Sequence, residues 1–145
     1  MSPGMPDTAT VRRLLLALDE ALQNLRHHTG RPLQALSGDL DERWAVERGL
    51  QLCAQCVLDI CTHLAASQGR DVPDYASGID AMVELGILPA PFGHSFRGVA
   101  GFRNVLVHAY LDVDLERVHR LLNGGLEQFA EFARLVHAFI AGQDE

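Results

Sequence analysis

Four side chains between residues 103 and 110 have the types and the spacing that phosphodiester chemistry requires: Arg103, Asn104, His108 and Tyr110. A histidine, with an unperturbed pKa of about 6.5, can take the proton of a ribose 2′-hydroxyl or return one to a leaving 5′-oxygen. Arginine cannot deprotonate, and its planar guanidinium suits the charge that grows on the phosphorus oxygens. Asn104 can position a phosphate oxygen or the imidazole, and Tyr110 offers a hydroxyl and a stacking face.

On a helix these four side chains fall in one wedge. Asn104 and His108 are four residues apart on one face, and Arg103 and Tyr110 are seven apart on the adjoining face. One chain supplies only one histidine to the cluster, whereas metal-free cleavage uses both a base and an acid. We therefore expect the site to straddle the axis of a homodimer. The same spacing also fits a structural role, in which Arg103 pairs with a carboxylate, His108 satisfies a carbonyl and Tyr110 anchors the helix end.

The elements that position this cluster are predicted to be helices, because apolar residues recur at helical spacing and no alternating run suggests a sheet. The expected helices span residues 8–28, 41–67 with Asp41 as its cap, 75–85 closed by Gly86, about 93–110, and 115–141. Residues 29–40 read as a connector with at most a short helical turn, and Pro89 and Pro91 are expected to exclude regular structure. The sequence thus predicts an all-α, up-and-down bundle of about five helices in a single domain, residues 1–145, with a short flexible N-terminus of about eight residues.

Charge and cysteine content narrow the class of protein. A formal net charge of -7 disfavours a broad surface that coats nucleic acid, although a few arginines around a cleft can still hold one or two phosphates. No segment approaches the roughly 18 apolar residues of a membrane span, and a cytoplasmic protein is expected. Cys53, Cys56 and Cys61 crowd into one predicted helix, which favours core packing in a reducing compartment over disulfides or a metal site.

Several other polar residues could support the cluster. Asp59 and His63, on the long second helix, could orient Arg103 or His108, and a structural or solvated role is an open alternative for both. Three arginines flank the motif in sequence and either widen its positive field or are ordinary surface residues; these are Arg97, Arg117 and Arg120. No metal ligand set and no cofactor motif are expected.

The pattern Arg103-x4-His108-x-Tyr110 resembles the Arg-x4-His-x-Tyr motif of HEPN domains. Further stretches are similar to the HepT subfamily in the same order and at similar spacing, and the likeness extends from about Val11 onward. These stretches are 44–52, 58–60, 101–104 and 110–114.

The resemblance implies an HEPN-like bundle that works as a homodimeric, metal-independent endoribonuclease, the toxin of a toxin–antitoxin pair. It implies Arg103, His108 and Asn104 as catalytic residues, and an MntA-like nucleotidyltransferase antitoxin that transfers AMP to Tyr110, with which the toxin could form a hetero-oligomer. Adenylylation would place bulk and negative charge beside Arg103 and His108. The alternative is a non-catalytic helical partner, or substrate-binding subunit, of a minimal nucleotidyltransferase. The RNA target, tRNA or mRNA, does not follow from the sequence.

Overall fold

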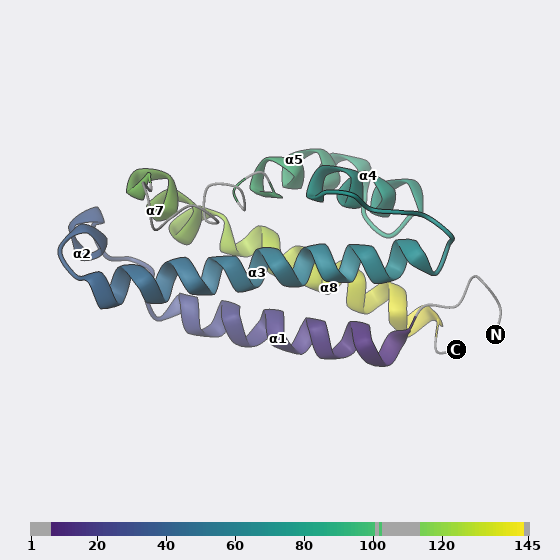
Figure 1. Ribbon diagram of the computed structural model, residues 1–145, viewed down its shortest axis with the longest axis horizontal. Helices are drawn as coiled ribbons and strands as arrows, with labels where there is room; N and C mark the ends of the chain where they lie inside the picture. The colour runs from purple at the N-terminus through teal and green to yellow at the C-terminus, as the bar shows by residue number, and fades with distance from the viewer. Residues whose placement is uncertain (1–6, 101, 103–113, 144–145) are drawn as a thin grey trace.

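The computed structural model describes residues 7–100, 102 and 114–143, and these residues form seven helices and no strand. The all-α prediction is confirmed. Four helices make the frame of the bundle, and their bounds are α1 (Thr8–Arg26), α3 (Leu40–Ala66), α7 (Leu115–Gly124) and α8 (Leu126–Gln143). Figure 1 shows α1 and α3 running side by side in opposite directions, with α8 behind them and antiparallel to α1. The short α2 (Leu33–Ser37) lies at the end of the bundle where α1 leads into α3.

Two further helices lie on the side of α3 that faces away from α1. They are α4 (Tyr75–Glu84) and α5 (Ala90–Ala100), which pack against each other, and α4 also packs on α3. As predicted, Gly86 follows the end of α4 with a left-handed backbone at φ 77°, a conformation that glycine adopts without steric penalty. The amide of Ile87 then donates to the carbonyl of Met82, which completes the turn into α5.

The core follows from the apolar stripe of α3. Val46, Leu50, Cys53, Val57 and Ile60 repeat at three- and four-residue spacing, and each is at most 1% exposed. Together with the buried residues of α1 and α8 they form one continuous hydrophobic cluster.

The helical spacing of the apolar residues predicts that Trp44 also belongs to this stripe, and that prediction is wrong. The residue precedes Val46 by two positions, which on a helix puts it about 200° away. Its side chain is 57% exposed.

The start of α5 departs from the prediction. Pro89 and Pro91 were expected to exclude regular structure, but α5 begins at Ala90, and the amide of Gly93 donates to the carbonyl of Pro89 at 2.9 Å. Proline is compatible with the first turn of a helix because the amides there have no intrahelical partner.

Two other helix boundaries also differ. The cap of α3 is Asp39 rather than Asp41, since its carboxylate accepts from the amides of Asp41 (3.0 Å) and Glu42 (3.3 Å). The helix expected over 115–141 is two helices that meet at Gly124 and Gly125. The Gly125 backbone lies so close to Leu121 that an added Cβ would come within 2.3 Å of that side chain.

No segment was expected to be long and apolar enough to cross a membrane. Among the described helices, α3 is long and apolar enough by length and composition alone. In its most apolar 18-residue window, 56% of the residues are buried inside the bundle. This burial is the pattern of the core helix of a bundle, which passes the same test.

Candidate active site

The residues predicted to do chemistry lie between α5 and α7. Arg103, Asn104, His108 and Tyr110 are outside the described residues, but both flanks of the segment are placed. On one side Phe102 is 3% exposed and belongs to the hydrophobic core. On the other side Asp114 caps α7 by accepting from the amide of Arg117 at 3.2 Å.

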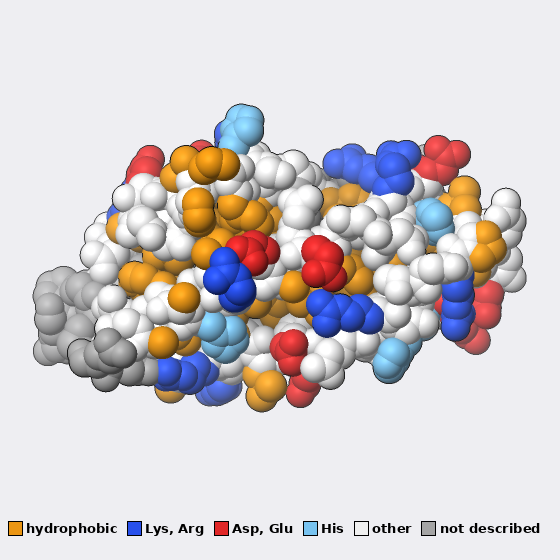
Figure 2. All heavy atoms as spheres, turned by 180° about the vertical axis from the view of Figure 1, so that it is seen from behind, with side chains coloured by type: hydrophobic (Ala, Val, Ile, Leu, Met, Phe, Trp, Pro, Cys, Tyr) orange, Lys and Arg blue, Asp and Glu red, His pale blue; other side chains and the backbone are white. Residues whose placement is uncertain are grey.

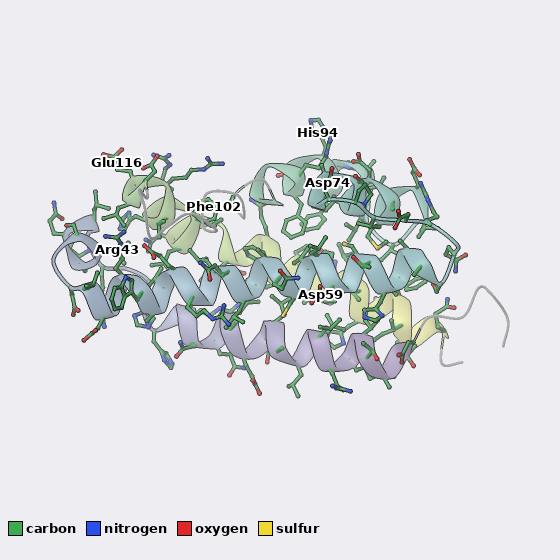
Figure 3. All side chains as sticks on the ribbon, viewed as in Figure 1. Arg43, Asp59, Asp74, His94, Phe102 and Glu116 are labelled. Carbon is green, nitrogen blue, oxygen red and sulfur yellow. The ribbon has the colours of Figure 1, made fainter. Side chains whose placement is uncertain are left out.

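The two flanks lie against each other. The guanidinium carbon of Arg117, in the first turn of α7, is 5.5 Å from the centre of the Phe102 ring. Figure 3 shows Phe102 between α5 and α7, with Glu116 on the outer side of α7. A contact of this kind between a cation and a ring face is attractive. The chain before and the chain after the segment 103–113 are therefore in contact through Phe102 and Arg117.

The middle and the C-terminal end of α7 are held to the connector that follows α1, at the same end of the bundle. The ring nitrogen Nε2 of His119 lies 2.8 Å from the carbonyl oxygen of Arg31. The side-chain oxygen of Asn123 accepts from the amide of Gly30 at 2.8 Å, and its nitrogen donates to the carbonyl of His119. These bonds fix the helix that follows the motif against the connector between α1 and α2.

The same connector is bound to α3 by a cluster built on Glu42. One oxygen of this carboxylate lies 2.8 Å from His28 Nδ1 and 2.8 Å from Arg31 Nη1. The Glu42 side chain is only 11% exposed, so its ion pairs are screened less than those of a surface carboxylate. The connector thus joins α1, α3 and α7 at one end of the molecule.

On α3 a row of polar side chains repeats every four residues, at 43, 47, 51, 55 and 59. Glu47 is 6% exposed and pairs with Arg43 Nε at 2.8 Å. The sequence did not lead us to predict this ion pair between Arg43 and Glu47. The signal was an acidic residue between the apolar Val46 and Leu50, with an arginine one turn earlier.

Asp59 and His63 were predicted as supporting residues, and they lie one helical turn apart on α3. Asp59 lies in the C-terminal third of α3 and accepts a hydrogen bond from Gln55 Nε2 at 2.9 Å. His63 is in the last turn of α3, near Asp7. The pKa of Asp7 is lowered first by its hydrogen bonds from Thr10 and to a lesser extent by the charge of His63. Figure 1 shows the C-terminal end of α3, which carries His63, far from α7. A supporting role of Asp59 or His63 toward the motif stays a prediction.

The three cysteines are packing residues. Burial raises the pKa of Cys53 and of Cys61 to about 12, and burial together with the charge of Asp59 raises that of Cys56 to about 11. A thiol with such a pKa is a poor nucleophile and a poor metal ligand at neutral pH. In the part of the chain that the structure describes, no group of three or more His, Cys, Asp or Glu residues is arranged to hold a metal ion.

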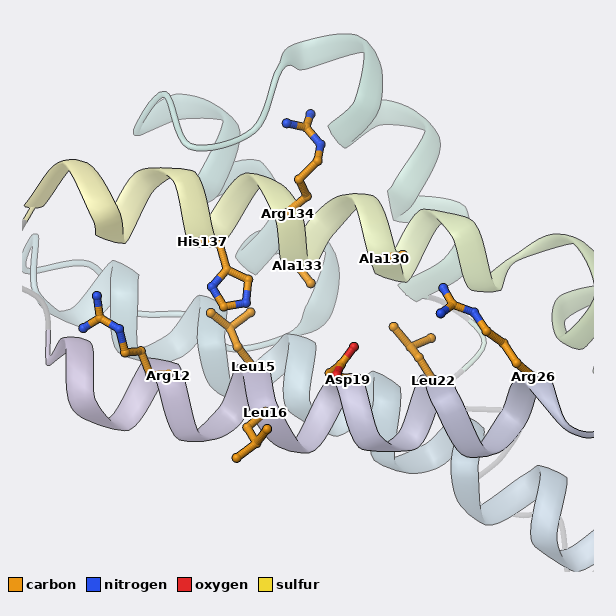
Figure 4. Close-up of a pocket in the computed structure, with 10 residues that line it drawn as sticks. All are labelled: Arg12, Leu15, Leu16, Asp19, Leu22, Arg26, Ala130, Ala133, Arg134 and His137. Atoms are coloured by element: carbon orange, nitrogen blue, oxygen red, sulfur yellow. The ribbon is translucent and has the colours of Figure 1, made fainter.

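A groove of about 620 Å³ lies elsewhere, between α1 and α8. Its floor contains Leu15 and Leu22, and its edges carry Arg12, Arg134 and His137 (Figure 4). Seen from this side, apolar surface is surrounded by charged side chains of both signs (Figure 2). Among the described residues that line the groove, none is Phe102 and none belongs to α7.

Comparison with known proteins identifies nucleases among the proteins that this chain resembles. The chain is 26% identical to the tRNA nuclease HepT of Aphanizomenon flos-aquae over 129 residues, which cover 86% of this chain and 85% of that protein. It is 24% identical to the mRNA nuclease HepT of Shewanella oneidensis over 90 residues, covering 61% and 68%. The fold superposes on the tri-AMPylated HEPN toxin of Shewanella oneidensis in complex with MNT antitoxin, with a TM-score of 0.77 and 19% identity over 88% of this chain and 96% of that one.

The sequence also matches the family described as Ribonuclease HepT-like over residues 18–136. This range contains both flanks of the site and the whole Arg103-x4-His108-x-Tyr110 pattern. The expected enzyme class and the expected HEPN-like fold are confirmed at the level of the family. The chain belongs to the ribonuclease HepT-like family.

Proposed function

We propose that this protein is a cytoplasmic, homodimeric and metal-independent endoribonuclease, the toxin of a toxin–antitoxin pair. The observation that carries the proposal is the family match over residues 18–136, because it includes the full motif. His108 acts as acid or base, Arg103 stabilises the charge on the phosphorus oxygens, and Asn104 positions the reacting groups. In the cleavage step the ribose 2′-oxygen bonds to phosphorus, the bond to the 5′-oxygen breaks, and the 2′-proton is lost as the 5′-oxygen gains one.

The dimer is part of this proposal. Attack and departure occur on opposite sides of phosphorus, so a base and an acid are both needed. A twofold axis through the site supplies a second His108 without any further residue. The curated relatives are named for different substrates, a tRNA and an mRNA nuclease, so the proposal extends to RNA and not to a particular RNA.

Induced expression of the wild-type chain without a partner tests the proposal. We expect growth arrest and fragmented total RNA, and the purified protein should cut RNA in the presence of EDTA. Size-exclusion chromatography with light scattering should give a dimer. A protein that leaves RNA intact while Tyr110 is unmodified by mass spectrometry would favour the alternative, a non-catalytic partner of a nucleotidyltransferase.

Tyr110 is the proposed point of control. An MntA-like nucleotidyltransferase would join the phenolic oxygen of Tyr110 to the α-phosphorus of ATP, with loss of the phenolic proton and departure of pyrophosphate. The added phosphate would repel a substrate phosphate from the motif. Support comes from the fold relative, an AMPylated HEPN toxin in complex with MNT antitoxin.

The matched variant is Tyr110→Phe. Incubated with such an enzyme and ATP, the wild type should gain the mass of AMP and stop cutting RNA, while Tyr110→Phe should gain no mass and stay active. Equal labelling of the two proteins would contradict the assignment of Tyr110.

A further inference from the structure

Every basic side chain of this protein, histidine aside, is an arginine, and most of the described ones are engaged with carboxylates. Six of them form ion pairs: Arg26, Arg31, Arg43, Arg70, Arg97 and Arg134. Arg117 and Arg120, both on α7, pair with no carboxylate of the described chain. They are three residues apart, and both are exposed. Arg13 and Arg48 also form no ion pair with a described carboxylate, but neither of them lies on a flank of the motif.

The contact of Arg117 with Phe102 places the pair of arginines on α7 beside the motif. Phe102 directly precedes Arg103 in the chain, and the Arg117 guanidinium lies over its ring at 5.5 Å. A guanidinium stacked on a ring keeps its N–H groups at the edge, where they can donate to an anion. The aromatic contact therefore fixes the direction of Arg117 without consuming its donors.

Arg120 extends the positive surface by one helical turn. Residues three apart on a helix have Cβ atoms about 5–6 Å from each other, so the two guanidinium groups can contact one flexible ligand together. The third arginine that flanks the motif in sequence differs, because Arg97 Nε lies 3.3 Å from Asp80 Oδ1. Of the three flanking arginines, the structure leaves two available for a ligand.

The other polar groups of α7 do not compete for this surface. Asp114 is occupied as the helix cap, and His119 and Asn123 hold the helix to the connector after α1. Glu116 projects on the outer side of the helix (Figure 3). Contacts with Phe102 near the start of α7 and with Gly30 near its end hold the helix that carries both arginines. A rigid element of this kind positions binding side chains precisely.

We propose that Arg117 and Arg120 form a phosphate-binding subsite that holds the RNA strand next to the bond that is cut. The inference rests on the proposed function and names the part of the surface that binds the strand. Phosphate is the expected ligand because the guanidinium fork matches its oxygens. Contact with the backbone rather than the bases implies that the subsite contributes affinity and little sequence preference.

Binding of a fluorescein-labelled single-stranded oligouridylate to the His108→Ala protein, measured by anisotropy at several KCl concentrations, tests the subsite. Arg120→Gln should raise Kd about tenfold, the loss expected for one charged hydrogen-bonding contact. The slope of log Kd against log[KCl] should fall by about 0.7 per phosphate contact removed. Arg117→Met, which keeps an apolar chain over Phe102, should act in the same way.

Arg13→Gln is the matched control because it also removes one exposed arginine, but from α1 rather than from α7. It should leave Kd and the salt slope unchanged. With His108 intact, Arg120→Gln should raise KM for an RNA that the wild type cuts and leave kcat unchanged, a split that a structural role would not produce.

The subsite is overturned if both α7 variants bind the probe as tightly as their parent, if the parent does not bind it, or if Arg13→Gln weakens binding equally. Thermal melts separate misfolding from lost contact, and Arg120→Gln decides the matter if Arg117→Met does not fold. Failure of the proposed function looks different, because the wild type would then cut no RNA at all.

Discussion

Replacement of His108 by alanine is expected to abolish RNA cleavage and growth arrest while the dimer stays intact. In the proposed dimer each copy of His108 serves as either the base or the acid, so the variant loses both proton-transfer groups at once. A positioned acid or base typically contributes about 10²–10⁴-fold to the rate. Because two such groups are lost, the cleavage rate should fall by about 10⁴-fold or more. Cleavage of total RNA by the purified proteins in EDTA, followed on denaturing gels, measures the effect.

His94→Ala is the control for this variant. His94 is an exposed histidine of α5 that points away from the bundle (Figure 3), and its replacement should leave cleavage unchanged. Cleavage by His108→Ala at the wild-type rate would remove the acid–base role. Equal loss in both variants would show that any change near α5 inactivates the protein.

Replacement of Phe96 by alanine is expected to have the largest effect on stability. Phe96 is 1% exposed, and its ring centroid lies 5.2 Å from Phe92, 5.6 Å from Phe129 and 5.3 Å from Phe132. Loss of a buried phenylalanine lowers the free energy of unfolding by about 3–5 kcal/mol. A domain of this size is stable by about 5–15 kcal/mol, so a large share of the total would be lost. Urea unfolding followed by circular dichroism measures the change.

Phe139→Ala, at a half-buried position of α8, is the comparison. It should reduce the free energy of unfolding less, because less apolar surface returns to water. If the Phe139 variant were the less stable of the two, the aromatic cluster would not be the main attachment of α5. Since α5 leads into the motif, Phe96→Ala should also lose RNA cleavage at a lower temperature than the wild type.

The long helices were predictable because burial imposes a period on the sequence. The stripe from Val46 to Ile60 defines α3, and the aligned leucines of α1 define its partner. Boundaries were less predictable, since they depend on single residues whose effect is decided by position. Pro91 was compatible with a helix because it falls in the first turn of α5, and the close approach of Gly125 to Leu121 divides one apolar stripe into two helices.

The site was predictable as a set of residue types and not as a set of neighbours. The spacing of Arg103, His108 and Tyr110 pointed to phosphodiester chemistry. The contacts that fix its surroundings join distant parts of the chain, such as Gly30 to Asn123 across 93 positions and Arg31 to His119 across 88. No local pattern encodes such pairs, and only the folded bundle brings them together.

The position of α8 against α1 has a consequence for the timing of synthesis. The 77 residues that follow Ala66, up to Gln143, take roughly 4–15 s to translate, and until then α1 and α3 lack Phe129, Phe132 and Val136 to close their core. A nascent chain in this interval exposes apolar surface and has no finished fold. An inhibitor that recognises the folded surface therefore has nothing to bind until the last helix has been made.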